Sequence, residues 1–432
     1  MLINFSVGNY RSFKDVVTLS MVAARITSKN KQIDTENVFQ VGNVSLLKSA
    51  SIYGANASGK SNLFRAFSFM RRFVLRSTDA NSEDLIKVEP FLLSAETEQA
   101  PSFFEVIFVQ DGIRYRYGFE VSVNKVHAEW LFRTVKRETE LFWREDDKIA
   151  IKEGFKEGKG LEDRTRSNAL FLSVVDQWNG ETAGKIVSWF RKVGLISGLN
   201  DRAYLGFTVD QMVNQTPIAL KIQDFMRRMD FGILDVLAEK RNSDPKFFSM
   251  LLEQVDNVPN DLRNALSNGE WFVPIVKTKH QKYAESGQKT ALVEFDMDDH
   301  ESEGTKKAFA LSGPLLHTLQ TGRVLFVDEL DTRLHPMMTR EIVRLFNSND
   351  TNPKNAQLIF ATHDANLLDN RFFRRDQIWF TEKNRYGATD LYSLVEYKIR
   401  NDASFEADYI AGKYGAIPYI RNIKSLVGGG DE

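Results

Sequence analysis

The sequence of 432 residues contains no cysteine. This absence excludes disulfide bonds, thiolate zinc sites, iron–sulfur clusters and catalysis by a thiol. It is compatible with a reducing compartment, where disulfides are rare.

Long hydrophobic runs are also lacking. No window approaches the roughly 18 uninterrupted apolar residues of a membrane span. The opening letters, MLINFS, lack the basic region and apolar stretch of a signal peptide. We therefore expect a soluble, cytoplasmic protein with no membrane partner.

Neither sign of charge dominates the composition. The 57 Lys and Arg residues nearly balance the 58 Asp and Glu residues, for a formal net charge of -1. Composition alone therefore requires neither a nucleic acid nor an anionic surface as a partner.

The hydrophobic patterning indicates an α/β protein. Short strands dominate the first part of the chain, including a hairpin over 103–123 with its turn at 110–112. Helical periodicity takes over from about 164 to 267, and strand signals return at 271–276 and 291–297. The apolar runs 324–327 and 358–361 are typical of strands buried on both faces of a parallel sheet. We expect a division into 1–160, a helical insertion over 161–268, and 269–432.

Residues 54–61 read Gly-Ala-Asn-Ala-Ser-Gly-Lys-Ser, a complete Walker A motif. An apolar strand precedes the motif and an amphipathic helix follows it, which is the context that the motif needs. Glycines let consecutive backbone N–H groups face phosphate oxygens, and the helix N-terminus adds its positive end. The residues predicted to contact ATP here are Gly54, Asn56, Ser58, Gly59, Lys60 and Ser61, with the Ser61 hydroxyl also a ligand of Mg²⁺.

An apolar strand at 324–327 ends in Asp328 and Glu329, which is the form of a Walker B motif. Such a strand delivers carboxylates at its carboxyl end, beside the phosphate loop. We predict that Asp328 holds Mg²⁺ and that Glu329 polarises the attacking water. A solvated acidic turn is the alternative interpretation of these two residues.

His363 follows the next predicted strand, within Ala361-Thr362-His363-Asp364. Its place after Walker B predicts a group that senses the γ-phosphate, although a structural histidine remains the alternative. The other five histidines have no metal-ligand spacing.

Together these motifs resemble the ABC-type ATPases of the SMC, RecF and OLD-like branch. Within that branch, the sequence is most similar to the stand-alone, AAA-annotated ATP-binding proteins of prokaryotic phage-defence islands, including the RloA-like group. The segments Val7–Phe13 and Phe405–Pro418 also carry the resemblance. It implies an ABC-type P-loop NTPase head, with a mixed β lobe and a parallel-sheet core, interrupted by the helical insertion.

The resemblance implies further site residues. Arg11 matches an arginine that approaches the nucleotide in this branch. The segment 301–307 looks like the ABC signature, which assigns nucleotide contacts to Ser302, Gly304 and Thr305. The segment 330–336 occupies the D-loop position. A second signature-like segment, 311–314, lies too close to Walker B and contains Pro314, so we reject it. The Q-loop cannot be placed.

The family mechanism requires a second copy of the chain. Each nucleotide lies between Walker A, Walker B and His363 of one subunit and the signature of the other. ATP would therefore hold a homodimer, or a larger even assembly, together, and hydrolysis would release it.

Three functions are compatible with these features. The first is an anti-phage ATPase that controls a separately encoded effector such as a nuclease, because only about 30 residues follow Arg400 and they leave no room for a nuclease domain. The second is a RecF-type DNA-repair ATPase that binds DNA directly through basic–aromatic stretches at 71–76, 114–117 and 371–375. The third function is that of the ATP-binding subunit of a transporter. The predicted N-terminal turn at residues 9–12 disfavours it.

Overall fold

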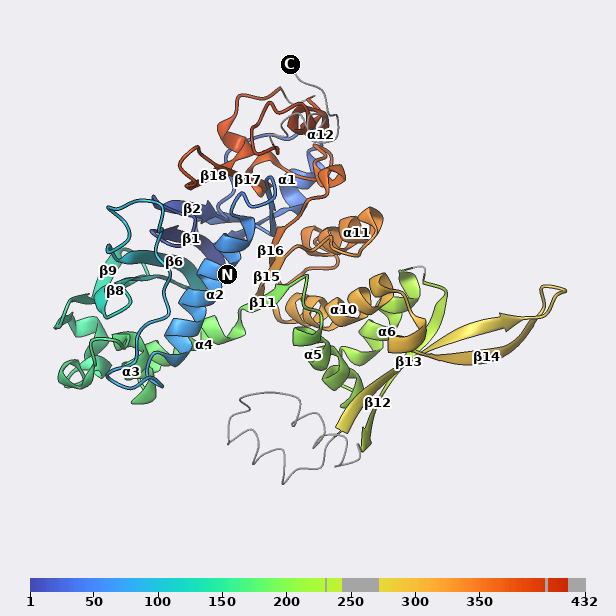
Figure 1. The fold of residues 1–432 in the computed structure, drawn as a ribbon, viewed down its shortest axis with the longest axis horizontal. Coiled ribbons are helices and arrows are strands. Elements are labelled where there is room, and N and C mark those ends of the chain that lie inside the picture. Colours follow the sequence, from blue (N-terminus) through green and yellow to red (C-terminus); the bar gives the residue numbers. More distant parts are fainter. Residues whose placement is uncertain (230, 243–271, 401–402, 419–432) are drawn as a thin grey trace, which may run out of the picture. The chain divides into compact units, whose positions relative to one another are not determined.

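The structure is a computed structural model that describes residues 1–229, 231–242, 272–400 and 403–418. The chain forms two compact units. Unit 1 comprises Met1–Leu199, Thr318–Thr332 and Thr339–Glu432, and unit 2 comprises Asn200–His317 and Arg333–Met338. The elements of each unit can be followed in Figure 1.

One sheet of unit 1 is antiparallel, with seven strands in the order β10-β9-β8-β7-β6-β1-β2. Its strands are β1 (Leu2–Gly8), β2 (Val17–Ser20), β6 (Ser102–Gln110), β7 (Ile113–Val121), β8 (Val126–Thr134), β9 (Glu138–Glu145) and β10 (Lys148–Ile151). The predicted hairpin is confirmed, because β6 pairs with β7 through a turn in which Asp111 and Gly112 have φ of 51° and 76°. Two-residue hairpin turns favour such positive φ values.

The second sheet of unit 1 has six strands in the order β11-β15-β16-β5-β17-β18. The strands are β5 (Ser49–Tyr53), β11 (Gly194–Ser197), β15 (Val324–Asp328), β16 (Gln357–Ala361), β17 (Ile378–Lys383) and β18 (Thr389–Ser393). The first five are parallel, and β18 is antiparallel to β17. The carboxyl ends of parallel strands share one edge, so the residues that follow β5, β15 and β16 come together there.

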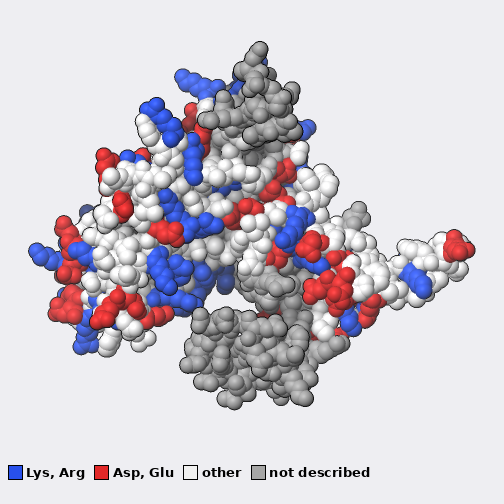
Figure 2. Space-filling view, in the orientation of Figure 1, with Lys and Arg blue, Asp and Glu red and all other residues white. Residues whose placement is uncertain are grey.

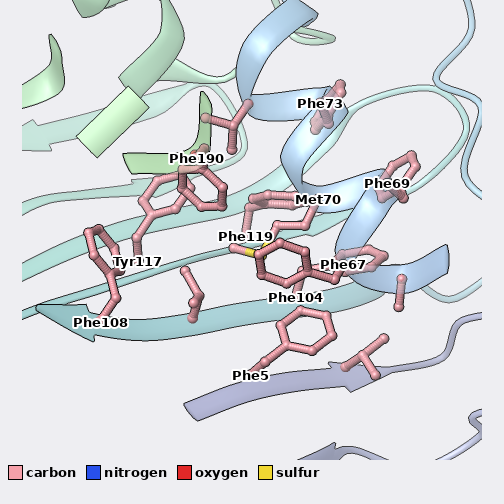
Figure 3. Packing of buried hydrophobic residues seen from close by; sticks show 14 of the residues in the cluster. Phe5, Phe67, Phe69, Met70, Phe73, Phe104, Phe108, Tyr117, Phe119 and Phe190 are labelled. Atoms are coloured by element: carbon pink, nitrogen blue, oxygen red, sulfur yellow. The ribbon is translucent and has the colours of Figure 1, made fainter. Parts of the chain in front are cut away.

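An aromatic core fixes the helix that follows the phosphate loop. Helix α2 (Lys60–Arg76) buries one face, as the spacing of its apolar residues predicts. Figure 3 shows Phe67 and Phe69 of α2 among aromatic side chains of the antiparallel sheet. Phe67 lies 5.1 Å from Phe5 and Phe69 lies 4.9 Å from Phe104, measured between ring centroids. Burial of each such ring stabilises the fold by about 1.5–3 kcal/mol, so α2 has a firmly fixed position.

Shorter elements complete unit 1. They are α1 (Gln32–Glu36), β3 (Val38–Val41), β4 (Val44–Leu47), α3 (Phe171–Gln177), α4 (Glu181–Lys192), α12 (Phe405–Ile410) and the 3-10 helices Glu153–Gly158, Glu162–Arg164, Ala365–Leu367, Arg375–Gln377 and Leu394–Glu396. Helices α10 (Glu303–Thr321) and α11 (Pro336–Asn347) each contain residues of both units. No helix in the described parts of the chain is long and apolar enough to cross a bilayer.

Unit 2 combines helices with a small sheet. It holds α5 (Arg202–Val213), α6 (Ala219–Arg228), α9 (Met297–His300), most of α10, and the antiparallel strands β12 (Ile233–Asn242), β13 (Phe272–Tyr283) and β14 (Lys289–Asp296). Helices α5 and α6 contact β12.

This division differs from the expected helical insertion over 161–268. Residues up to Leu199 belong to unit 1, because the short strand β11 pairs in parallel with β15. The expected insertion also contains the strand β12. The part of the insertion from residue 243 to 268 lies outside the described residues. A four-residue strand carries too weak a period to be recognised among helical patterns.

Candidate functional site

The loop between β5 and α2 has the backbone of a phosphate cradle. Gly54 and Gly59 have φ of 153° and 117°, in the region that favours glycine. Both glycines are also crowded. A Cβ at Gly54 would lie 2.4 Å from the Thr381 carbonyl oxygen, and one at Gly59 would lie 2.4 Å from Thr389 Oγ1. The two glycines of the motif are therefore required by conformation and by space.

Two threonines of the neighbouring strands hold the loop. The hydroxyls of Ser58 and Thr381 are hydrogen-bonded at 2.6 Å, and Thr389 Oγ1 donates to the Ser58 carbonyl at 2.8 Å. All three residues are buried. Sequence analysis missed both threonines, because they lie more than 300 residues from the loop and belong to no motif.

Lys60 turns back over the loop. Its Nζ donates to the carbonyl oxygens of Gly54 and Ala55 at 2.7 and 3.1 Å. Burial lowers the pKa of Lys60, and the nearby Asp328 and Glu329 carboxylates oppose this shift. The ammonium group is thus held among oxygen acceptors at the sheet edge, in the position where the motif predicts the terminal phosphates. Asn56 lies exposed on the same loop.

Asp328 and Ser61 fit the donor set for a magnesium ion. The Asp328 carboxyl is hydrogen-bonded by Ser61, but its Oδ1 is buried without a hydrogen-bond partner. Burial raises the pKa of Asp328, and Glu329 adds to this shift. A carboxylate and a hydroxyl suit Mg²⁺, which takes its remaining oxygen ligands from phosphates and water. The described residues contain no cluster of three or more His, Cys, Asp or Glu that could hold a metal alone.

The backbone of Glu329 is held in an unusual conformation. Its φ is 56°, and its Oε2 accepts a hydrogen bond from Thr332 Oγ1 at 3.1 Å. Gly198, which follows β11, donates its N–H to the Asp328 carbonyl at 2.6 Å. A Cβ at Gly198 would lie only 2.0 Å from the Glu329 carbonyl oxygen. Gly198 therefore makes room for the turn that presents Glu329, a role that no sequence pattern indicates.

His363 and Asp331 meet at the end of β16. The backbone N–H of His363 donates to Asp331 Oδ2 at 3.2 Å. The pKa of His363 is lowered, first by burial and then by the positive charge of Lys60. The imidazole is therefore neutral near pH 7 and shares its surroundings with Lys60, Asp328 and Glu329. This is the set of residues that the motifs predicted to converge.

Arg11 lies near the first turn of α2. Its φ is 51°, and its guanidinium forms an ion pair with Glu89. Together with Ser12 and Asn62 it lines a cavity of about 510 Å³. Asn62 Nδ2 donates to Ser12 Oγ at 2.8 Å, which ties the N-terminal turn to α2 two residues after Lys60.

The predicted signature residues begin α10 in unit 2, whereas the other candidate residues belong to unit 1. Thr305 donates its N–H to Ser302 Oγ at 3.2 Å, so Ser302 caps the helix. The rejected segment 311–314 lies inside α10, where it cannot present a helix N-terminus.

A family model described as "AAA domain, putative AbiEii toxin, Type IV TA system" matches residues 49–369, most of the chain. The chain belongs to this AAA family. The match spans the Walker A and Walker B motifs, the segment 301–307 predicted as the signature, and His363. The protein accordingly has an AAA-type P-loop domain in an α/β fold, which combines an antiparallel sheet with a mainly parallel sheet that carries the phosphate loop.

A search of curated proteins found no significant match. Among solved structures, this AAA-family chain is similar to the SMC head domain from Thermotoga maritima, with 13% identity, TM-score 0.38 and coverage of 91% of this chain and 98% of that one. It is also similar to an SMC head bound to the C-terminal winged-helix domain of ScpA, with 12% identity, TM-score 0.45 and coverage of 91% and 97%. It is also similar to the recombination mediator protein RecF with ATPγS, with 15% identity, TM-score 0.35 and coverage of 90% of this chain and 98% of that one.

Proposed function

We propose that this protein binds and hydrolyses ATP with Mg²⁺, dimerises through the bound nucleotide, and thereby controls a separately encoded effector in anti-phage defence. The single observation that carries the proposal is the convergence of Lys60, Asp328, Glu329 and His363 at one edge of the parallel sheet. A phosphate loop, two adjacent carboxylates and a histidine in this arrangement suit the binding and hydrolysis of a nucleoside triphosphate.

Nucleotide binding would change the contacts of the loop. Lys60 Nζ would exchange its bonds with the loop carbonyls for phosphate oxygens, and the N–H groups at the start of α2 would face the same phosphates. Ser61 and Asp328 would hold Mg²⁺, which neutralises phosphate charge when bound. Arg11 would leave Glu89 and contact the nucleotide from the cavity beside α2.

Hydrolysis would depend on Glu329 and His363. Glu329 would orient a water molecule and accept its proton, while the neutral imidazole of His363 would hydrogen-bond the γ-phosphate. Asp331 restrains the backbone of His363 and so fixes where the ring can reach. Closure of the site by a second copy would place Ser302, Gly304 and Thr305 of that copy at the γ-phosphate, with the N-terminus of α10 facing the anion.

The link to an effector and to defence rests on family context. The description of the family names a type IV toxin–antitoxin system, which has two components. A chain whose described residues are occupied by an ATPase head would act through such a second component. We infer that the ATP-held state and the released state differ in their affinity for this partner.

The alternative, a RecF-type ATPase that binds DNA directly, has weaker support. Arg116 forms ion pairs with Glu105 and Glu138, and the Arg71 Nε donates to the carbonyl oxygen of Phe190. Arg374 is likewise paired with Asp376. These guanidinium groups are engaged within the fold and are poorly placed to neutralise DNA phosphates. Basic side chains do gather over α4 on the face that Figure 2 shows, and this is the observation that favours DNA.

The proposal is tested by following bound nucleotide in the native protein, Glu329→Gln and Lys60→Ala with Mg²⁺. Native protein should release ADP, Glu329→Gln should retain unhydrolysed ATP, and Lys60→Ala should retain none. Lys185→Ala removes an exposed lysine that pairs with Glu181 on α4 and should behave as native. Hydrolysis at the native rate by Glu329→Gln would remove Glu329 from this role. Co-purification with the neighbouring gene product, with and without ATP, tests the effector.

A further inference from the structure

Arg333 links the D-loop to the start of the signature helix within one chain. It follows Glu329 by four residues and has a positive φ of 63°. Its Nη1 donates to Asp201 Oδ2 at 2.9 Å and to Glu303 Oε2 at 3.3 Å. The one guanidinium thus joins three segments of unit 2 that are far apart in sequence.

The backbone of Arg333 makes a second contact with the same helix turn. A Cβ at Gly304 would lie 2.8 Å from the carbonyl oxygen of Arg333. Gly304 therefore admits this carbonyl, and the left-handed conformation of Arg333 directs it there. The first turn of α10 is held at two points, one at the Glu303 carboxylate and one at Gly304.

Asp201, the other partner of Arg333, is itself fixed. Tyr204 donates its hydroxyl to Asp201 Oδ1 at 2.7 Å, and this contact together with burial raises the pKa of Tyr204. The Asp201 side chain is only 15% exposed, and the fully buried Lys307 of α10 lies 3.8 Å from it. An ion pair at such a site is screened less by salt than an exposed one.

We infer that Arg333 is a positioning residue for the signature. It would set the place of Ser302, Gly304 and Thr305, the residues assigned to the second copy's nucleotide. This inference rests on the proposed function and names the residue that holds the first turn of α10 in place for the second copy's nucleotide.

The test places Arg333→Ala in the Glu329→Gln background and measures mass by light scattering with Mg²⁺ and ATP. We expect bound ATP to remain close to one per chain, while the dimer affinity falls at least tenfold. Arg333→Lys keeps the charge and should restore part of that affinity. Arg344→Ala, which removes an exposed arginine paired with Glu341 on α11, is the matched control and should dimerise fully.

A purely structural role for Arg333 is separated by kinetics. In the otherwise native protein, Arg333→Ala should lower kcat at least tenfold and leave the KM for ATP within about twofold. If Arg333→Ala unfolds, Glu303→Gln decides, because Glu303 is 62% exposed and substitutions at exposed positions usually change stability little. This variant should weaken the dimer by a smaller factor, about threefold. Undiminished dimer affinity in Arg333→Ala, or in Glu303→Gln where that variant decides, would overturn the inference.

The control arm separates this failure from that of the proposed function. If Glu329→Gln alone dimerises with ATP and Arg333→Ala does not weaken it, the ATP-held dimer stands and only the role of Arg333 falls. If Glu329→Gln binds ATP without dimerising, the proposed dimer itself fails.

Discussion

The phosphate loop of unit 1 and the first turn of α10 in unit 2 both depend on a glycine that lies against a carbonyl oxygen. The loop is held by buried hydroxyls, with Ser58 bonded to Thr381 of β17 and to Thr389 of β18. The turn at Gly304 is held by ion pairs whose Arg333 and Glu303 side chains are 39% and 62% exposed. Buried neutral contacts of this kind fix a shape, whereas partly exposed ion pairs give little stability and can exchange partners. The comparison indicates a rigid phosphate loop and a first turn of α10 whose ion pairs can exchange partners.

Lys60→Ala should have the largest effect and tests the rigid side of the comparison. Loss of a buried cation that faces phosphate oxygens should weaken ATP binding by roughly 2–5 kcal/mol. Calorimetric titration with ATP and Mg²⁺ measures this change. An unchanged Kd would show that the loop binds phosphate without its lysine, and Lys185→Ala serves as the control.

Gly198→Ala should have the next largest effect, because it acts on the turn of Glu329. The added Cβ would lie 2.0 Å from the Glu329 carbonyl, so the backbone must shift. Overpacking of this kind costs about 1–3 kcal/mol. We expect the activation free energy of hydrolysis to rise by a similar amount, so that kcat falls while ATP still binds. Gly206→Ala, where a Cβ meets nothing within 4 Å, is the matched control. Native kcat in Gly198→Ala would contradict the role of this glycine.

Arg11→Ala should have a moderate effect on ATP binding. The residue belongs to unit 1, but its ion pair with Glu89 is partly exposed and can exchange partners. The guanidinium must leave Glu89 to reach a nucleotide. The loss of this ion pair offsets part of the free energy that the new contact contributes to binding. We expect the Kd for ATP to rise about 3- to 10-fold. Glu89→Gln frees Arg11 and should shift the Kd the other way. A rise in both variants would mean that the pair serves the fold and not the nucleotide.

Asp328→Asn should have the smallest effect of the four variants, a change in thermal stability. The substitution should stabilise the fold although it removes the proposed Mg²⁺ ligand. Burial raises the pKa of Asp328, so without Mg²⁺ the ionised carboxylate destabilises the fold. This cost is absent below the ordinary pKa of an aspartate and fully present above the raised one. In EDTA at pH 8 the variant should therefore unfold on the order of 1–2 °C higher than the native protein, with the difference vanishing as the pH falls below the ordinary pKa of an aspartate. Asp350→Asn, at an exposed position, should show no shift.

The parts of the site that sequence predicts are those built from neighbouring residues. The loop 54–61, the strand that ends at Asp328 and the helix after Lys60 each carry a local pattern, and the structure contains all three. Residues that support the site from a distance carry none. Thr381, Thr389 and Gly198 act through contacts that depend on how the strands pair.

The boundaries between the units show the same limit. The strand β11 is recognised only by its pairing with β15, so the division at Leu199 was not predictable from periodicity. The ion pair of Arg333 with Asp201 spans 132 positions in the sequence, and a single charged residue in a loop is typical of many surfaces.

The central claim is that ATP itself joins two copies of the chain. The most direct measurement is the mass of Glu329→Gln in solution, by light scattering, with Mg²⁺ and ATP and then after the nucleotide is removed. The account predicts twice the mass of one chain with one ATP bound per chain, returning to a single chain when ATP is gone. A protein that stays monomeric with its nucleotide bound would contradict it.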